Sequence, residues 1–340
     1  VNATPAYDVT ATPDGLSAAV AAVAATGGSV YLPAGTYHAT DLVIPGNVHV
    51  VGAGAGTVIV PVVGPDPVWG MVHLAGANAS LQDLVLDNQN RALGGTEGAE
   101  VWIESGARDP LIQRVTMRNV QRVGVGSYSD HLGVSIQDSS MSADGTGSPN
   151  ARWAGASLRF GDASSGDASM FRSTVTGFAG AGLEFRIPTG APGPAARNVA
   201  VDNTMTHIKE PTSDGNDGTH EFGIWSAGED AVIIGNTTTD LGWAGIQTID
   251  HSRGSFVADN TTRGAYGGIW IENGSLDVVV EGNDVDATWY GITLEWPHDG
   301  GSAVNRIAMR GNVIVAPLTG IYVMRFTDDN LIEANRIHGV

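Results

Sequence analysis

Cysteine is absent from this chain of 340 residues. Without cysteine there is no disulfide framework, no thiolate nucleophile and no cysteine-ligated zinc. The sequence also lacks any run approaching the roughly 20 uninterrupted apolar residues that a membrane-spanning helix needs. We therefore expect neither cysteine-based chemistry nor a membrane partner.

Basic side chains are scarce, since 17 Lys and Arg stand against 36 Asp and Glu and the formal net charge is −19. A surface this acidic repels polyanions, so nucleic acid is not expected as a partner. The sequence starts at Val1 without the basic and apolar regions of a signal peptide, as a processed export product does. We predict a secreted, extracellular protein.

Glycine is abundant, with 47 residues spread evenly among Val, Ile, Thr and Asn. This distribution is typical of many short strands joined by tight turns rather than of a flexible linker. Only residues 14–26 favour a helix, because Leu16, Val20 and Val23 recur at helical spacing and Gly27 follows as a C-cap. The sequence therefore predicts an all-β fold with one helix near the N-terminus.

An internal repeat organises the second half of the chain. Six asparagines end short apolar runs: Asn203, Asn236, Asn260, Asn283, Asn312 and Asn335. Their spacings are 33, 24, 23, 29 and 23 residues, and each except the last is followed by a Gly–Ile pair. These spacings indicate a unit of about 23 residues with insertions near 209–220 and 297–304.

A repeat this short cannot bury its own apolar face, so successive units must stack and share one core. Three short strands per unit then form a coil of parallel strands, with about 4.8 Å between coils. The asparagines are expected to form a ladder whose side-chain amides bond coil to coil, in a bend where asparagine tolerates left-handed backbone. We predict one domain over residues 1–340, with a cap at 1–30 and coils at 31–340.

The start of the chain carries a family resemblance. Residues 27–37, GGSVYLPAGTY, and residues 42–57, LVIPGNVHVVGAGAGT, resemble the opening of right-handed parallel β-helix proteins of the pectate lyase superfamily. The resemblance implies a right-handed solenoid whose N-terminal helix caps the first coil. It also implies a substrate groove on the outer face of the strand that begins with Gly–Ile. That superfamily contains lyases, hydrolases, epimerases, transglycosylating enzymes and phage adhesins, so the resemblance is weak for the reaction.

Strand alternation predicts which residues of the Gly–Ile strands face outward. One outward column contains Glu184, Trp225, Gln247, Trp270, Thr293 and Tyr322, and a second contains Arg159, Arg186, Ala227, Ile249, Glu272 and Glu295. Exposed tryptophan suits the apolar face of a sugar ring. The candidate substrate-binding residues are Trp225, Gln247, Trp270, Trp296, His298, Tyr322, Arg186 and Arg159. In the preceding turn, Trp243, Tyr266 and Trp289 are equally compatible with a structural aromatic stack and with a sugar platform.

The carboxylates give the sharper signal. Glu272 and Glu295 occupy one column in adjacent coils, where two like charges repel unless a proton, cation or substrate intervenes. The pKa of one should rise, which provides an acid and a base from the same residue type. Asp250 lies one coil further, about 9 Å from Glu295 by strand spacing. Retaining and inverting glycosidases need separations of about 5–5.5 Å and 6.5–9.5 Å, and these three residues offer both.

Three functions fit this pattern. The favoured one is a glycoside hydrolase or intramolecular glycosyl-transferring enzyme on a neutral polysaccharide or oligosaccharide, with Glu272, Glu295 and Asp250 as catalytic residues and no metal or cofactor. The alternative is a calcium-assisted lyase or C5-epimerase on a polyuronate, in which Arg159, Arg186 or a histidine abstracts or stabilises the proton at C5. The oxygen-rich residues 214–218 are a candidate calcium loop for this alternative. A non-catalytic carbohydrate-binding adhesin is the third.

The end of the sequence stops part-way through a coil. An open strand edge invites aggregation. We expect either that a partner subunit covers this coil in a homo-oligomer or that the natural chain continues.

Overall fold

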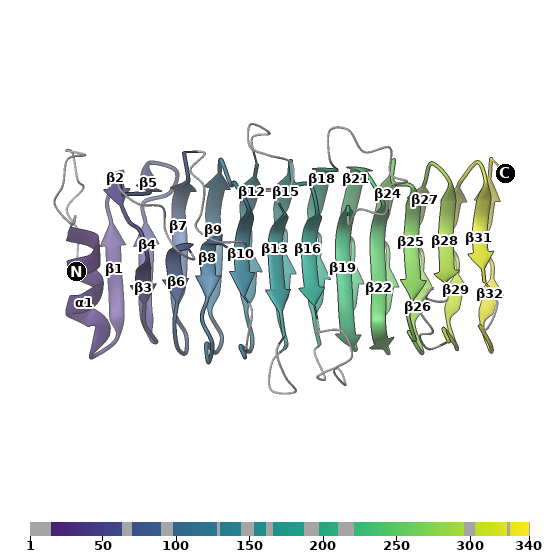
Figure 1. Cartoon of the computed structure of the whole chain (residues 1–340), viewed down its shortest axis with the longest axis horizontal. Coiled ribbons are helices and arrows are strands. Elements are labelled where there is room, and N and C mark those ends of the chain that lie inside the picture. The colour runs from purple at the N-terminus through teal and green to yellow at the C-terminus, as the bar shows by residue number, and fades with distance from the viewer. Residues whose placement is uncertain are drawn as a thin grey trace.

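The computed structural model describes residues 15–62, 70–89, 98–127, 130–143, 153–160, 166–186, 197–209, 221–295, 303–324 and 327–339. Figure 1 shows an elongated stack of coils, with the single helix α1 (Gly15–Ala24) at one end and the C-terminus at the other. Within these residues, no helix has the length and apolar character needed to cross a membrane. The expected solenoid is confirmed.

Helix α1 caps the first coil. Its buried side chains follow the helical spacing seen in the sequence: Leu16, Ala19, Val20 and Val23. They join the core of the solenoid, and Gly27, with φ of 71°, follows the helix before the chain turns into the first strand. The helix therefore covers an end of the core that would otherwise be open to water.

One face of the solenoid is an 11-stranded parallel sheet, which we call the groove sheet. Its strands, in order along the stack, are β3 (Leu42–Ile44), β6 (Gly70–Leu74), β8 (Ala99–Ile103), β10 (Val123–Ser127), β13 (Ala154–Arg159), β16 (Ala181–Arg186), β19 (Phe222–Glu229), β22 (Ala244–Arg253), β25 (Gly267–Glu272), β28 (Tyr290–Glu295) and β31 (Thr319–Val323). These include the strands that the Gly–Ile repeat predicts.

The other strands form a 22-stranded sheet in which two parallel columns are joined by the long strands β7 (Ser80–Asp87) and β9 (Leu111–Arg118). The first column comprises β1 (Gly28–Leu32), β4 (Val48–Gly52), β11 (Ser135–Gln137), β14 (Ser169–Phe171), β17 (Val199–Val201), β20 (Val232–Ile234), β23 (Phe256–Ala258), β26 (Val279–Glu281), β29 (Ala308–Arg310) and β32 (Leu331–Glu333). The second comprises β2 (Gly35–His38), β5 (Thr57–Val60), β12 (Ser140–Ser142), β15 (Thr174–Thr176), β18 (Thr204–Ile208), β21 (Thr237–Leu241), β24 (Thr261–Arg263), β27 (Asp284–Asp286), β30 (Val313–Val315) and β33 (Arg336–His338).

The interior is packed by columns of like residues. Ile224, Ile246, Ile269 and Ile292 are successive rungs of the groove sheet and are fully buried. The glycine before each isoleucine also faces inward: a Cβ on Gly245 would lie 2.6 Å from both the Gly268 carbonyl oxygen and Thr262 Cγ2. The glycine column therefore lets the groove sheet pack closely against the opposite wall.

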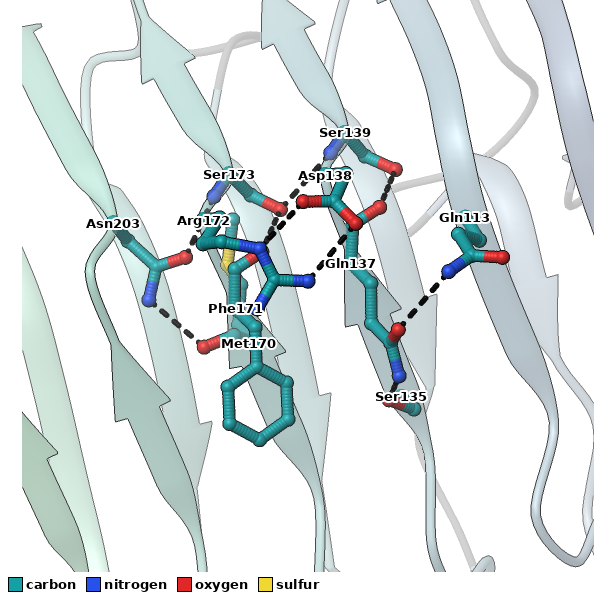
Figure 2. Close-up of polar contacts among 10 residues, drawn as sticks. All are labelled: Gln113, Ser135, Gln137, Asp138, Ser139, Met170, Phe171, Arg172, Ser173 and Asn203. Atoms are coloured by element: carbon teal, nitrogen blue, oxygen red, sulfur yellow. Dashed lines mark hydrogen bonds and ion pairs between the residues drawn. The ribbon is translucent and has the colours of Figure 1, made fainter.

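The predicted asparagine ladder is confirmed between the two columns of the larger sheet. Each Nδ2 donates to the Oδ1 of the next coil at 2.9–3.0 Å, from Asn203 through to Asn335. Earlier coils use serine at the same place, where Ser173 Oγ accepts from the Ser139 backbone N–H at 3.1 Å. Figure 2 shows this change from asparagine to serine, which explains why the repeat is faint in the first half of the sequence.

The left-handed backbone expected of the ladder asparagines belongs instead to the residue before them. Asp138, Arg172 and Asp202 have φ of 50°, 45° and 56°. This conformation turns the side chains of this position outward, where the Arg172 guanidinium donates to the Asp138 carboxylate at 2.7 and 2.9 Å (Figure 2). The side chain of the following asparagine or serine then lies inside the bend.

Candidate functional site

The paired glutamates lie where the repeat places them. Glu272 is the last residue of β25, Glu295 is the last residue of β28, and the two are direct partners in the parallel register. Both side chains are half-buried. The expected column is therefore confirmed, and its two carboxyls leave the groove sheet on adjacent rungs about 4.8 Å apart at the backbone.

Glu272 is the member of this pair with the raised pKa. Burial raises its pKa from 4.5 to about 7, and repulsion from Glu295 and then from Asp250 adds to the rise. Hydrogen bonding from Gln247 and Trp270 lowers the pKa in part. At neutral pH a large fraction of Glu272 therefore carries a proton that it can donate.

Asp250 sits near the end of β22 with a left-handed φ of 54°. Its Oδ1 accepts a hydrogen bond from Asn273 Nδ2, which fixes the carboxylate beside the next coil. Because its charge contributes to the raised pKa of Glu272, Asp250 acts on the pair electrostatically. The structure thus brings together all three predicted catalytic carboxylates.

The aromatic residues differ from expectation. Trp225 and Trp270 are only 7% and 4% exposed, whereas the sequence predicts rings open to the groove. They form an external apolar cluster with Phe222 and Ala244, against which Trp243, Ile249, Tyr266 and Tyr290 pack. The turns before the groove strands therefore cover the outward column. Gln247, at 3% exposure, is buried in the same column.

The covering layer is an aromatic stack. The Trp243 and Tyr266 ring centroids are 5.0 Å apart, and those of Tyr266 and Trp289 are 5.5 Å apart. Tyr290 and Tyr322 stack at 5.3 Å. Trp289 and Tyr322 are 48% and 38% exposed, so a ligand can reach both rings. The sequence left Trp289 equally compatible with a structural stack and with a sugar platform, because the register of the strands does not reveal which ring lies at the exposed end of a stack.

The predicted arginines lie further along the groove sheet. Arg159 and Arg186 are direct partners on β13 and β16, as the sequence predicts. Arg186 is engaged by Glu184, whose Oε1 is 3.3 Å from Arg186 Nη1. This arginine pair lies on different coils from the glutamate pair.

A histidine near these arginines is inside the solenoid. His131 is fully buried, its Nε2 lies 2.7 Å from Ser127 Oγ, and burial lowers its pKa to about 4. The Arg159 backbone N–H donates to the same Ser127 oxygen at 3.2 Å. These hydrogen bonds among His131, Ser127 and Arg159 hold the end of β13, and the His131 imidazole faces the interior of the solenoid.

Two predicted binding residues, Trp296 and His298, lie outside the described residues, as does the loop 214–218. Among the residues that the structure describes, no three His, Cys, Asp or Glu side chains are grouped to hold a metal ion. Two site features escaped sequence reasoning: Trp153, which approaches Glu184, and Glu100, a fully buried carboxyl. Neither residue belongs to the Asn and Gly–Ile repeat of the sequence.

The comparisons with known proteins agree with this architecture. Residues 163–337 match the family model described as a right-handed β-helix region. A curated relative, the mannuronan C5-epimerase AlgE2 of Azotobacter vinelandii, is 35% identical over 141 residues, which cover 35% of this chain and 14% of that protein. The match therefore spans a small part of the relative.

Two solved structures show the same fold. The A-module of the Azotobacter vinelandii mannuronan C-5 epimerase AlgE6 aligns with 97% of this chain and 98% of its own, at 18% identity and a TM-score of 0.59. The catalytic unit of a GH87 α-1,3-glucanase from Streptomyces thermodiastaticus aligns with 96% of this chain and 68% of its own, at 15% identity and a TM-score of 0.58. With the family model matching more than half of its length, this chain belongs to the right-handed β-helix family.

Proposed function

We propose that this protein is a carbohydrate-active enzyme that cleaves or transfers glycosidic bonds of a neutral polysaccharide or oligosaccharide. The observation that carries the proposal is the glutamate pair, in which burial and charge repulsion raise the pKa of Glu272 to about 7 beside Glu295. Such a pair supplies a protonated acid and an ionised carboxylate at one pH.

In the proposed reaction, Glu272 donates its proton to the glycosidic oxygen as the bond to the leaving sugar breaks. The Glu295 carboxylate attacks or stabilises the anomeric carbon from the other side. Adjacent rungs are about 4.8 Å apart at the backbone, a spacing that suits the carboxyl separation of about 5–5.5 Å in retaining enzymes. Glu272 then takes a proton from water, or from an acceptor hydroxyl in the transferring version, as that oxygen bonds to the anomeric carbon and releases the Glu295 carboxylate. Asp250 favours the protonated form of Glu272.

The surroundings support a sugar ligand. Trp289 and Tyr322 are the exposed members of the aromatic stack and offer flat apolar surfaces to a sugar ring. The net charge of −19 favours an uncharged chain over a polyanion. No metal or cofactor takes part in this scheme, and the proposed location is extracellular, where polysaccharides are met.

Product analysis on a polysaccharide panel tests the proposal. Glu272→Gln and Glu295→Gln should each lower turnover by about 10²–10⁴-fold with the fold intact. Glu281→Gln is the matched control, because Glu281 pairs with Arg310 on the opposite sheet. Near-normal turnover in both groove variants would overturn the assignment, and activity that survives EDTA would support a reaction without metal.

A second candidate is a calcium-assisted lyase or C5-epimerase on a polyuronate. It is favoured by the stacked Arg159 and Arg186, which suit substrate carboxylates, and by the local match to a mannuronan C5-epimerase. A lyase would release an unsaturated, ultraviolet-absorbing product and lose activity in Arg186→Ala but not in Glu295→Gln. A third, the adhesin, would bind glycans without cleaving any of them.

A further inference from the structure

A shallow pocket opens on the groove sheet away from the glutamate pair. It is lined by Trp153, Ala181, Glu184, Arg186, Phe222 and Trp225, from β16, β19 and the residue before β13. The Trp153 carbonyl accepts backbone N–H bonds from Gly180 and Ala181 at 2.9 and 2.8 Å, so this wall is fixed to the coil above it. We call it the Glu184 pocket.

The Glu184 carboxyl is held rigidly at the base of this pocket. Its side chain is 6% exposed. Ser157 Oγ donates to Oε2, Trp153 Nε1 approaches the same oxygen at 3.4 Å, and Arg186 Nη1 approaches Oε1 at 3.3 Å. A carboxylate has about four lone-pair directions, so Glu184 keeps acceptor capacity for a ligand.

Arg186 is the reachable donor of the pocket. Its side chain is 37% exposed, and its guanidinium carbon lies 5.4 Å from the centroid of the Trp225 ring. The cation–π contact and the Glu184 ion pair orient the guanidinium, and its further N–H groups can donate to a ligand in the pocket. Donor and acceptor thus stand side by side on residues i and i+2 of one strand face.

The chemistry of this pair suits a neutral sugar. Because Arg186 and Glu184 neutralise each other, the pocket offers one donor and one acceptor without excess charge from the pair. Two adjacent hydroxyls of a pyranose can accept from the guanidinium and donate to the carboxylate, while the aromatic walls meet the apolar face of the ring.

The position of the pocket relates it to the glutamate pair. Glu184, Trp225, Gln247 and Trp270 are consecutive partners in the groove sheet, and Glu272 follows Trp270 on the same strand. Three rungs correspond to about 14 Å along the stack. An oligosaccharide that reaches both places must therefore contain several sugar units.

We propose that the Glu184 pocket is a distal subsite for one neutral sugar unit of a chain whose reacting bond lies at Glu272 and Glu295. This inference rests on the proposed function, because that function places the reacting bond at Glu272 and Glu295. The subsite recognises vicinal hydroxyls through Arg186 and Glu184, and it makes binding depend on chain length.

Direct binding tests the subsite without turnover. The probes are nigerotetraose and cellotetraose, their disaccharides, and tetramannuronate, titrated by calorimetry into the full chain carrying Glu272→Gln. At least one neutral tetraose should bind more tightly than its disaccharide. Arg186→Met and Glu184→Gln should each weaken tetraose binding by about tenfold or more, as expected for lost hydrogen bonds to a charged group.

Arg172→Met is the matched control, because Arg172 forms an exposed pair with Asp138 on the larger sheet. It should leave tetraose affinity unchanged. A second readout leaves the charged residues of the pocket in place. The indole N–H resonance of Trp153, assigned by its absence from Trp153→Phe, should shift when tetraose is added to the full chain carrying Glu272→Gln alone.

Three results would overturn the subsite: equal affinity of tetraose and disaccharide, a Trp153 resonance that does not move, or Arg186→Met behaving like Arg172→Met. Binding of tetramannuronate alone would also overturn it, in favour of an anion site. If tetraose binding depends on Arg186 but no glycan is cleaved by the unaltered protein, the proposed reaction fails while the subsite stands.

Discussion

At the scale of single residues, position within a column decides how an ionisable group behaves. Glu100 lies between Ala99 and Val101, whose partners Val123 and Val125 flank Gly124. It therefore occupies the column that later coils reserve for inward glycine. Both its carboxyl oxygens are buried without a hydrogen-bond partner among the described residues, and burial raises its pKa well above 4.5.

Glu100→Gln should remove a pH-dependent loss of stability. The folded chain keeps a proton on Glu100 that the unfolded chain releases above the ordinary value of 4.5, so stability is complete below that pH and falls as pH rises. The slope from this one group is at most about 1.4 kcal/mol per pH unit. Urea unfolding at several pH values should show that the free energy of unfolding of the variant rises relative to that of the unaltered chain as pH rises.

The exposed Glu281→Gln serves as control, because Glu281 is 43% exposed beside Arg310. It should follow the unaltered protein at every pH. A Glu100→Gln curve parallel to the unaltered one would show that the Glu100 carboxyl is ionised in the folded state.

His131 gives the opposite dependence. Its pKa falls from 6.5 to about 4 through burial, so the unfolded chain takes up a proton that the folded chain refuses. Stability is therefore complete above 6.5 and is lost as pH falls toward 4, by at most about 3 kcal/mol. His131→Gln keeps a group able to bond Ser127 and should flatten this acid limb in urea unfolding. The exposed His338→Gln is the control and should keep the loss of stability at low pH. An equal loss of stability at low pH in both variants would contradict a buried neutral imidazole at His131.

At the scale of elements, the bends are held by side-chain amides rather than by turn backbone alone. Asn260 Nδ2 donates to Asn283 Oδ1 and to the Ile233 carbonyl, while its own Oδ1 accepts from the Asn236 backbone N–H. Each interior asparagine therefore links coils on both sides. Loss of one leaves buried partners unsatisfied.

Asn260→Ala should lower the free energy of unfolding by about 2–4 kcal/mol, since several buried polar groups lose their partners at once. Asn335→Ala, in the half-exposed last coil, is the matched control and should cost about 1 kcal/mol, because water replaces part of what is lost. Urea unfolding monitored by circular dichroism measures both. Equal losses at the two positions would argue against a cooperative ladder.

At the scale of the whole molecule, the repeat predicts which residues of successive coils are neighbours in the groove sheet. The Asn and Gly–Ile spacings gave the register of the groove sheet, and with it the neighbours Glu272 and Glu295. The repeat does not say what covers the outer face. Trp225 and Trp270 alternate outward as predicted, yet the turn residues Trp243 and Tyr266 bury them. Side-chain layers outside the coil depend on contacts that have no period in the sequence.

Two buried residues and the last coil also depart from the pattern that the repeat predicts. Glu100 breaks the glycine column, and His131 turns inward after its strand, because local packing rather than the repeat sets their direction. The last coil leaves Leu331, Ile332 and Ile337 exposed by 43–48%. A subunit that covers this coil in a homo-oligomer stays a prediction.

Burial is the main cause of the raised pKa of Glu272, and stacking of coils adds the charges of Glu295 and Asp250 on neighbouring rungs. The most direct test is a carbon-13 NMR titration of the Glu272 carboxyl in the unaltered protein, in Glu295→Gln and in Asp250→Asn. We predict a pKa of about 7 that falls in both variants, since each removes a nearby negative charge. An ordinary value near 4.5 that neither substitution changes would contradict the account.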